Sequence, residues 1–371
     1  MSEPRDSAAR RALARHPDEE TRYQAVSRLE PADAPDRAAL LEALADPSWR
    51  VRSAAVERLG TAPGGAAALP QLLEALSGGP NVGAREAAAT VLARLGAVAV
   101  PALVERLAAP DGDQRQAAAG VLGAVADRRA VAPLTARLAD ADPNVRAAAA
   151  EALGRIGGRE ALDALGAAVD SDDVTLRLTA LEALLRQGAC LPVEAMERLL
   201  ADRALRRPGY RLLGASDDPR ALPLVARGVA EPSRAARDAA LGALGQLRAR
   251  RPPDAIRPLL AAVRAAAAAD PGLPDAWAGA LSSEDPLVAA GALAALGAAG
   301  GPRHVAAMLR LAEDDRLRAL VDEAVEAMPA GAELRAALAE ALPALGQVAR
   351  LAALAALARL GSPAAFESLV R

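Results

Sequence analysis

One sequence motif recurs along most of the chain at a nearly constant interval. Each copy places an arginine, or in one copy an alanine, seven residues before a leucine or valine. These ladder positions are Arg22, Arg52, Arg85, Arg115, Arg146, Arg177, Arg206, Arg237, Ala289, Arg318 and Arg350. Neighbouring positions are 29 to 33 residues apart, except for one step of 52 between Arg237 and Ala289. A period of this length predicts a solenoid, whose units bury their apolar faces only by stacking on one another.

Each repeat predicts two helices, which we call the first and the second helix. In residues 142–171, Asp142 is placed to cap the first helix and Pro143 occupies its first position, a typical start signal. Gly157 follows the last apolar residue of this helix, where glycine commonly ends helices. A second amphipathic helix then begins at about Glu160.

The composition supports a wholly helical fold. The 371 residues are 52% hydrophobic but only 1% aromatic, and the apolar residues are mostly alanine, leucine and valine. Alanine and leucine are strong helix formers, whereas strands favour β-branched and aromatic residues. We therefore expect an all-α fold, with more than 70% helix and no sheet, built as a right-handed α-solenoid of about 11 helix hairpins.

The motif D-P-x-V-R-x-A-A-A-x-A-L-G-x-[IL]-G is nearly complete in residues 142–157 and closely matched in 46–60. It resembles the HEAT-like repeats of the short type first noted in phycobilisome bilin lyases, and the resemblance covers roughly residues 16–371. It implies that first helices line the convex face and second helices the concave, partner-binding face. It also implies a structural ladder of Asp–Arg contacts between neighbouring repeats. Its arginines would include Arg52, Arg85, Arg115, Arg146, Arg177 and Arg237.

The repeat pattern divides the chain unevenly. We expect an N-terminal arm or capping helix at 1–15, a HEAT-like array at 16–251, an irregular segment at 252–285 and further repeats at 286–371. The prolines of the irregular segment predict a long second helix at about 254–269 and an extra helix at about 274–282. Pro208 interrupts one first helix and predicts that this helix is shortened or starts at Pro208.

Charge is unevenly distributed although the whole chain carries only −3. Residues 202–251 hold eleven arginines against five acidic residues, and residues 270–340 hold twelve acidic residues against five arginines. The candidate partner-binding residues are Arg220, Arg227, Arg248, Arg250, Arg251, Arg257 and Arg264. Either these arginines dock an acidic protein segment, or they pair with local acids and face water.

The residue types needed for chemistry are scarce. The chain has one cysteine, Cys190, two histidines, His16 and His304, and no His-Glu dipeptide. We therefore expect no catalytic residues, no metal site and no cofactor, and predict a scaffold or adaptor that binds another protein. Two alternatives are an enzyme subunit resembling a bilin lyase, and a nucleic-acid binder acting through 202–251. The net negative charge argues against nucleic acid.

The sequence also bears on location. The first twenty residues are charged and contain no apolar core of a secretory signal. The longest uncharged apolar stretch, 286–301, is shorter than the roughly 20 residues that span a bilayer. We therefore expect a cytoplasmic protein without a membrane segment.

Overall fold

A computed structural model describes residues 7–77 and 81–361. Of these residues 76% are helical, and none of them lies in a strand. The prediction of an all-α solenoid is therefore confirmed. The chain forms two compact units, Met1–Gln187 and Gly188–Arg371.

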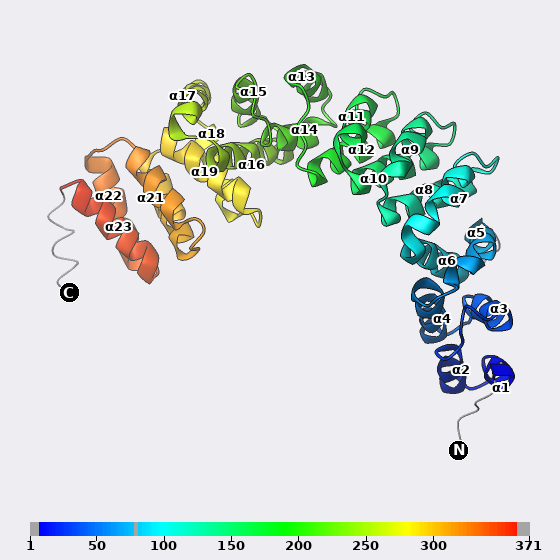
Figure 1. Cartoon of the computed structure of the whole chain (residues 1–371). Helices are drawn as coiled ribbons and strands as arrows, with labels where there is room; N and C mark the ends of the chain where they lie inside the picture. The colour runs from blue at the N-terminus through cyan, green and yellow to red at the C-terminus, as the bar shows by residue number, and fades with distance from the viewer. Residues whose placement is uncertain (1–6, 78–80, 362–371) are drawn as a thin grey trace. The chain divides into compact units, whose positions relative to one another are not determined.

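The first unit begins with α1 (Ser7–Leu13) and then alternates first and second helices (Figure 1). Its first helices are α2 (Glu19–Val26), α4 (Trp49–Thr61), α6 (Val82–Leu95), α8 (Gly112–Val125), α10 (Pro143–Ile156) and α12 (Val174–Arg186). Its second helices are α3 (Ala34–Ala43), α5 (Leu69–Ser77), α7 (Val100–Arg106), α9 (Val131–Arg137) and α11 (Arg159–Ala168). Asp142 caps α10 by accepting the backbone N–H of Asn144, as its sequence position predicts.

The second unit continues the alternation. Its first helices are α14 (Arg206–Leu213), α16 (Arg234–Arg250), α19 (Pro286–Ala299), α21 (Arg318–Ala327) and α23 (Gln347–Arg359). Its second helices are α13 (Val193–Ala201), α15 (Ala221–Gly228), α17 (Pro253–Ala269), α20 (Val305–Arg310) and α22 (Ala332–Ala341). Helix α18 (Leu273–Ala278) and the 3₁₀ turn Gly279–Ser282 form the extra helical segment. Helix α14 has eight residues, so the expected shortening at Pro208 is present.

First and second helices form separate rows within each unit. In the first unit α4, α6, α8 and α10 lie on the inner side of the curve, and α5, α7, α9 and α11 lie on its outer side (Figure 1). In the second unit α16 and α19 are likewise inside, and α15 and α17 outside (Figure 1). The expectation that second helices line the concave face is therefore wrong. We call the first helices of each unit its inner row.

Small side chains explain why the first helices occupy the inner side. A methyl group on Gly123 of α8 would lie 2.9 Å from Cβ of Ala152 on α10. One on Gly154 of α10 would lie 2.5 Å from Cβ of Ala183 on α12. The distance between packed helices depends on the side chains at their contact. The row with glycine and alanine at its contacts is therefore the shorter row, and the unit curves around it.

The extra helix α18 is fastened to the second helices on both sides of it. Trp277 is fully buried, and its Nε1 donates to the carbonyl of Val229 at the end of α15 (2.8 Å). On the other side, Asp275 lies 2.9 Å from Nε2 of the buried His304, which directly precedes α20. This bond holds the pKa of Asp275 below its ordinary value. The insertion is thus an integrated part of the second unit.

Helices α16 and α19 make the closest contact of this kind in the second unit. A methyl group on Gly291 of α19 would lie 1.8 Å from the carbonyl oxygen of Leu241, and one on Gly245 of α16 would lie 2.2 Å from that of Leu287. Main-chain atoms cannot rotate away as a side chain can. Only glycine fits at either position with the helices at this distance.

We predict that Gly291→Ala destabilises the second unit by about 1–3 kcal/mol or more, because it forces two helices apart. The matched control is Gly279→Ala. Position 279 has αR backbone angles, and no atom lies within 4 Å of the place that an added Cβ would take, so it accepts alanine without strain. Chemical denaturation followed by circular dichroism measures both. Equal stability of the two variants would contradict the close helix contact.

Candidate functional site

The ladder arginines connect consecutive repeats in a defined way. The Arg146 guanidinium donates through Nη1 to the carbonyls of Asp140 (2.8 Å) and Ala141 (3.1 Å) in the loop before its own helix. Its Nε and Nη2 donate to the carboxylate of Asp173, the residue that caps α12 (2.9 and 2.5 Å). One side chain thus fixes a loop and reaches the next repeat.

Three more ladder positions reach an acid in the same way. Arg22 binds Asp46 through Nε (2.8 Å) and Nη2 (3.1 Å), and Arg115 binds Asp140 through Nε (2.9 Å) and Nη2 (2.7 Å). Arg206 binds Glu231 at 3.1 Å. Each of these acids stands two residues before the residue that caps the next first helix. The arginine therefore links neighbouring repeats at each of these four positions.

Two of the remaining ladder positions, Arg52 and Arg237, depart from this arrangement. Within the described chain Arg52 binds the carbonyls of Asp46 (2.8 Å) and Pro47 (3.0 Å) and no carboxylate, so the expectation of an aspartate partner is wrong there. Arg237 binds the carbonyl of Glu231 (2.9 Å), and its buried Nε has no acceptor in the described chain. Arg177 on α12 donates to the carbonyl of Val169 (3.2 Å), and Arg85 holds the same position on α6. The carbonyl contacts recur more widely than the acid contact.

We predict that Arg146→Ala lowers the melting temperature of the protein by several degrees, because it removes two carbonyl contacts and leaves the partly buried Asp173 without its cation. Arg159→Ala is the control, since Arg159 is highly exposed and its ion-pair partner among the described residues, Asp163, lies 3.8 Å away. A surface pair of this kind contributes little. Thermal unfolding followed by circular dichroism compares the variants, and equal shifts would refute the structural role of the ladder.

A second prediction concerns pH. The hydrogen bonds from Arg115 hold the pKa of Asp140 below its ordinary value. A carboxyl whose pKa is lower in the folded state stabilises the fold above its unfolded pKa near 4, and this stabilisation is lost as pH falls through the folded pKa. We therefore expect Asp140→Asn to be less stable than wild type at pH 7 and to lose less stability between pH 5 and pH 2. Parallel pH curves for the two proteins would contradict this.

Three of the seven candidate partner-binding arginines are already paired with acids on the surface. Arg220 contacts Asp218 (2.7 Å) and Glu194 (2.5 Å). Arg250 contacts Asp217 (3.1 Å), and Arg257 contacts Asp254 (2.6 Å). Arg227 is exposed on α15 near Glu231. The first three arginines match the alternative in which basic residues pair locally and face water.

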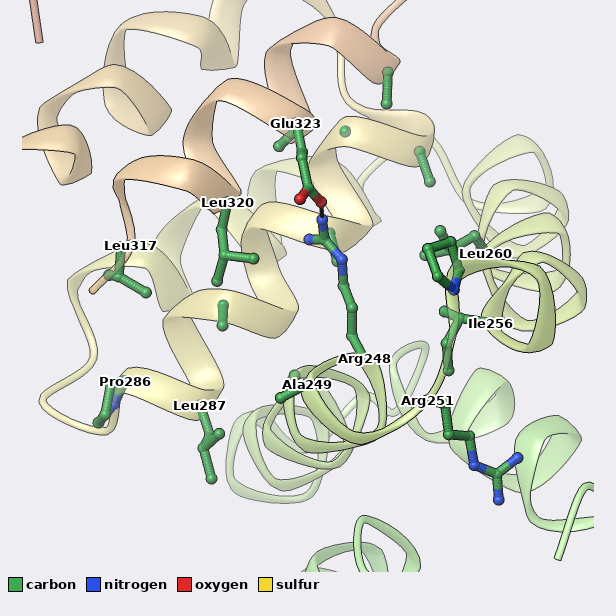
Figure 2. Close-up of a pocket in the computed structure, with 18 of the residues that line it drawn as sticks. Arg248, Ala249, Arg251, Ile256, Leu260, Pro286, Leu287, Leu317, Leu320 and Glu323 are labelled. Carbon is green, nitrogen blue, oxygen red and sulfur yellow. Dashed lines mark hydrogen bonds and ion pairs between the residues drawn. The ribbon is translucent and has the colours of Figure 1, made fainter. Parts of the chain in front are cut away.

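The other three candidates, Arg248, Arg251 and Arg264, line a cavity of about 490 Å³ in the second unit. Helices α16, α17, α19 and α21 surround it. Its apolar walls are Ile256 and Leu260 of α17, Pro286 and Leu287 of α19, and Leu317 and Leu320 at the start of α21. Figure 2 shows the Arg248 side chain extending from α16 between these walls to Glu323 of α21. The basic section thus contributes one end of a partly open, mostly apolar site.

Helix α19 forms the floor of this cavity and is unusual in its sequence. None of its fourteen residues, PLVAAGALAALGAA, is charged, and it has no polar face. A helix that is apolar on every side needs cover on every side. Neighbouring helices cover most of α19, but Leu287 remains 39% exposed at the cavity. The open part of the floor is therefore an apolar surface without a partner in the described chain.

The cavity carries an excess of positive charge. The Arg248 side chain is 18% exposed, and its partner Glu323 is 60% exposed. Burial lowers the pKa of the Arg248 guanidinium. Within the described chain Arg251 and Arg264 bind only carbonyl oxygens, those of Ser216 and Asp218 for Arg251 and that of Ala298 for Arg264. The cavity therefore combines apolar walls with Arg248, whose acid is largely exposed, and with Arg264, which lacks a carboxylate in the described chain; the Arg251 guanidinium points away from the cavity (Figure 2).

A profile of HEAT repeats matches residues 7–93 and 100–185. The chain is a HEAT-like repeat protein. Among solved structures, it is similar to the crystal structure of an engineered protein from a structural genomics consortium, with 20% sequence identity and a TM-score of 0.48. That comparison covers 98% of this chain and 100% of the engineered one. No curated protein matches the chain.

The described part of this HEAT-like repeat protein exposes seven large apolar side chains, and six of them lie on first helices. These six are Trp49, Val82, Val174, Leu178, Leu287 and Leu351; the seventh, Val98, lies in the 3₁₀ turn after α6. Trp49 is the most exposed, at 69%. Sequence reasoning missed these residues as a group because it assigned the binding face to the second helices.

The described residues of the HEAT-like repeat protein were also compared with the requirements of a metal site and of a membrane-spanning helix. Among residues 7–77 and 81–361 there is no group of three or more histidine, cysteine or acidic side chains that could hold a metal ion. In the same residues no single helix is long and apolar enough to cross a membrane. One pair passes that test together, Val82–Val98 and Val100–Arg106, but it is bent by 120°.

Proposed function

We propose that this protein is a non-catalytic scaffold that binds another protein through the inner rows of its units. The observation that carries the proposal is the placement of exposed large apolar side chains on first helices. Scattered exposed apolar residues are ordinary on protein surfaces. Their gathering on one kind of helix is what supports a binding face, because interfaces are centred on apolar and aromatic anchors.

Trp49 is the strongest candidate anchor in the first unit. It opens α4 and lines a shallow depression with Tyr23 of α2 and Arg50. The Arg50 guanidinium lies 4.6 Å from the centre of the Tyr23 ring and 3.1 Å from Glu20. These contacts join the start of α4 to α2, so the backbone that carries the exposed indole is held in place. Tryptophan is enriched among residues that dominate binding energy.

The few histidine and cysteine side chains that could act in catalysis make structural contacts or have low reactivity. This supports a binding protein over an enzyme. Nδ1 of His304 accepts the backbone N–H of Gly301 (3.1 Å), and its Nε2 contacts Asp275. Nδ1 of His16 accepts the backbone N–H of Asp18 (3.1 Å). Burial raises the pKa of the Cys190 thiol, which lowers its thiolate fraction and therefore its reactivity.

The surface arginines would add little affinity for an acidic partner. Arg220, Arg250 and Arg257 have acidic neighbours, so a partner would have to displace these before gaining an ion pair. Exposed pairs of this kind contribute more to the rate of encounter than to affinity. We therefore propose that apolar anchors on the inner rows supply most of the affinity.

The test compares two double variants of the first unit that each add two glutamates. Trp49→Glu with Leu178→Glu changes the inner row, and Gln71→Glu with Ala136→Glu changes exposed positions on the second helices α5 and α9. We expect partners captured by the wild-type protein to bind the first variant at least tenfold more weakly and the second variant normally. Circular dichroism verifies that both variants fold. Loss of binding only in the second variant would place the interface on the outer side.

A further inference from the structure

The cavity in the second unit contains a cation, Arg248, whose one carboxylate partner among the described residues faces solvent. Arg248 crosses the cavity (Figure 2), and its contact with Glu323 is the only polar contact its side chain makes within the described chain. Taking a guanidinium out of water is costly unless an anion accompanies it. The half-exposed Glu323 provides that anion at the edge of the cavity and leaves the apolar space beside Arg248 open.

We propose that this cavity binds a small monocarboxylate with an apolar chain or ring, whose carboxylate takes the place of Glu323 on Arg248. The proposal goes beyond the protein-binding function and does not depend on it, since that function is tested on residues of the first unit and this site lies in the second. An arginine fork binds a carboxylate through two parallel hydrogen bonds. The exchange replaces one carboxylate by another, so no buried charge is left unpaired, and Glu323 turns into water.

The size and walls of the cavity set the nature of the apolar part. A volume of about 490 Å³ lies within the range of small-molecule sites, which are mostly apolar with a few placed polar groups. Ile256 and Leu260 stand on one side of Arg248, and Leu287 and Leu320 on the other (Figure 2). An alkyl chain covers the open floor of α19, and burial of its methylene groups supplies affinity that a short carboxylate such as acetate lacks.

Charge decides between classes of ligand. Arg264 adds positive charge at the cavity without a carboxylate of its own in the described chain, whereas the Arg251 guanidinium points away from Arg248 (Figure 2). Arg316 also lines it, but it is paired with Asp314 at 2.7 Å. An amphiphile with a cationic head is repelled here, and a neutral alcohol gains no ion pair. The site therefore selects the anionic member of a series with the same chain.

The experiment measures binding of decanoate, decanol and decyltrimethylammonium to the full-length protein by isothermal titration calorimetry, below their micelle-forming concentrations. We expect one decanoate per chain, with decanol at least tenfold weaker and no binding of the cation. Arg248→Met should weaken decanoate at least tenfold. This variant keeps an apolar side chain of similar length in the cavity, and the half-exposed Glu323 stays in water, so the fold should survive.

Two further variants separate the proposal from unspecific apolar binding. Glu323→Gln removes the internal competitor and should bind decanoate several-fold more tightly than wild type, a gain that loss of structure cannot produce. Arg257→Met, which removes an exposed arginine of α17 outside the cavity, should leave the affinity unchanged. Equal binding of decanol and decanoate, unchanged affinity in Arg248→Met, or no gain in Glu323→Gln would each overturn the proposal.

Discussion

Close packing between first helices is the constraint on which the rest of the structure depends. Gly154 and Ala183 in the first unit, and Gly245 and Gly291 in the second, stand where a larger residue would meet the neighbouring helix. Because these contacts are short, first helices form the inner side of the curve and second helices are spread along the outer side. The same packing leaves the inner rows with long, continuous helical surfaces, and there the large apolar side chains are exposed.

The ladder arginines hold the loops that this packing brings together. The loops that precede successive first helices lie close together, since one arginine side chain reaches both. The Arg146 guanidinium binds two of these carbonyls and an acid of the next repeat with one side chain. Where the acid is missing, as at Arg52, the carbonyl contacts remain. The arginine at position 52 therefore still holds its loop although it has no acid partner in the described chain.

The sequence predicted those structural features that depend on residues close together along the chain. Helix caps such as Asp142, the short helix at Pro208 and the extra helix near Trp277 follow from local signals of proline, glycine and acidic residues. The assignment of the concave face was wrong because it rested on the resemblance and not on the sizes of the packed residues. The small residues of the first helices could have corrected it. Pairings between distant residues had no such local signal: Arg248 and Glu323 are 75 positions apart.

The sequence did contain one local signal near the cavity: α16 has no glycine at the position where several other first helices end. Counted from the ladder position, the residue eleven places later is Gly96 after α6, Gly157 after α10 and Gly300 after α19, and each of these glycines caps its helix. The same count from Arg237 reaches Arg248. Helix α16 therefore continues through the point where these first helices end, and α17 is equally long, at 17 residues. The end of α16 lies beside the start of α19, because Gly245 faces Leu287 and Gly291 faces Leu241. The added turn of α16 therefore supplies Arg248 to a cavity that α17, α19 and α21 also line, and Glu323 of α21 pairs with it there.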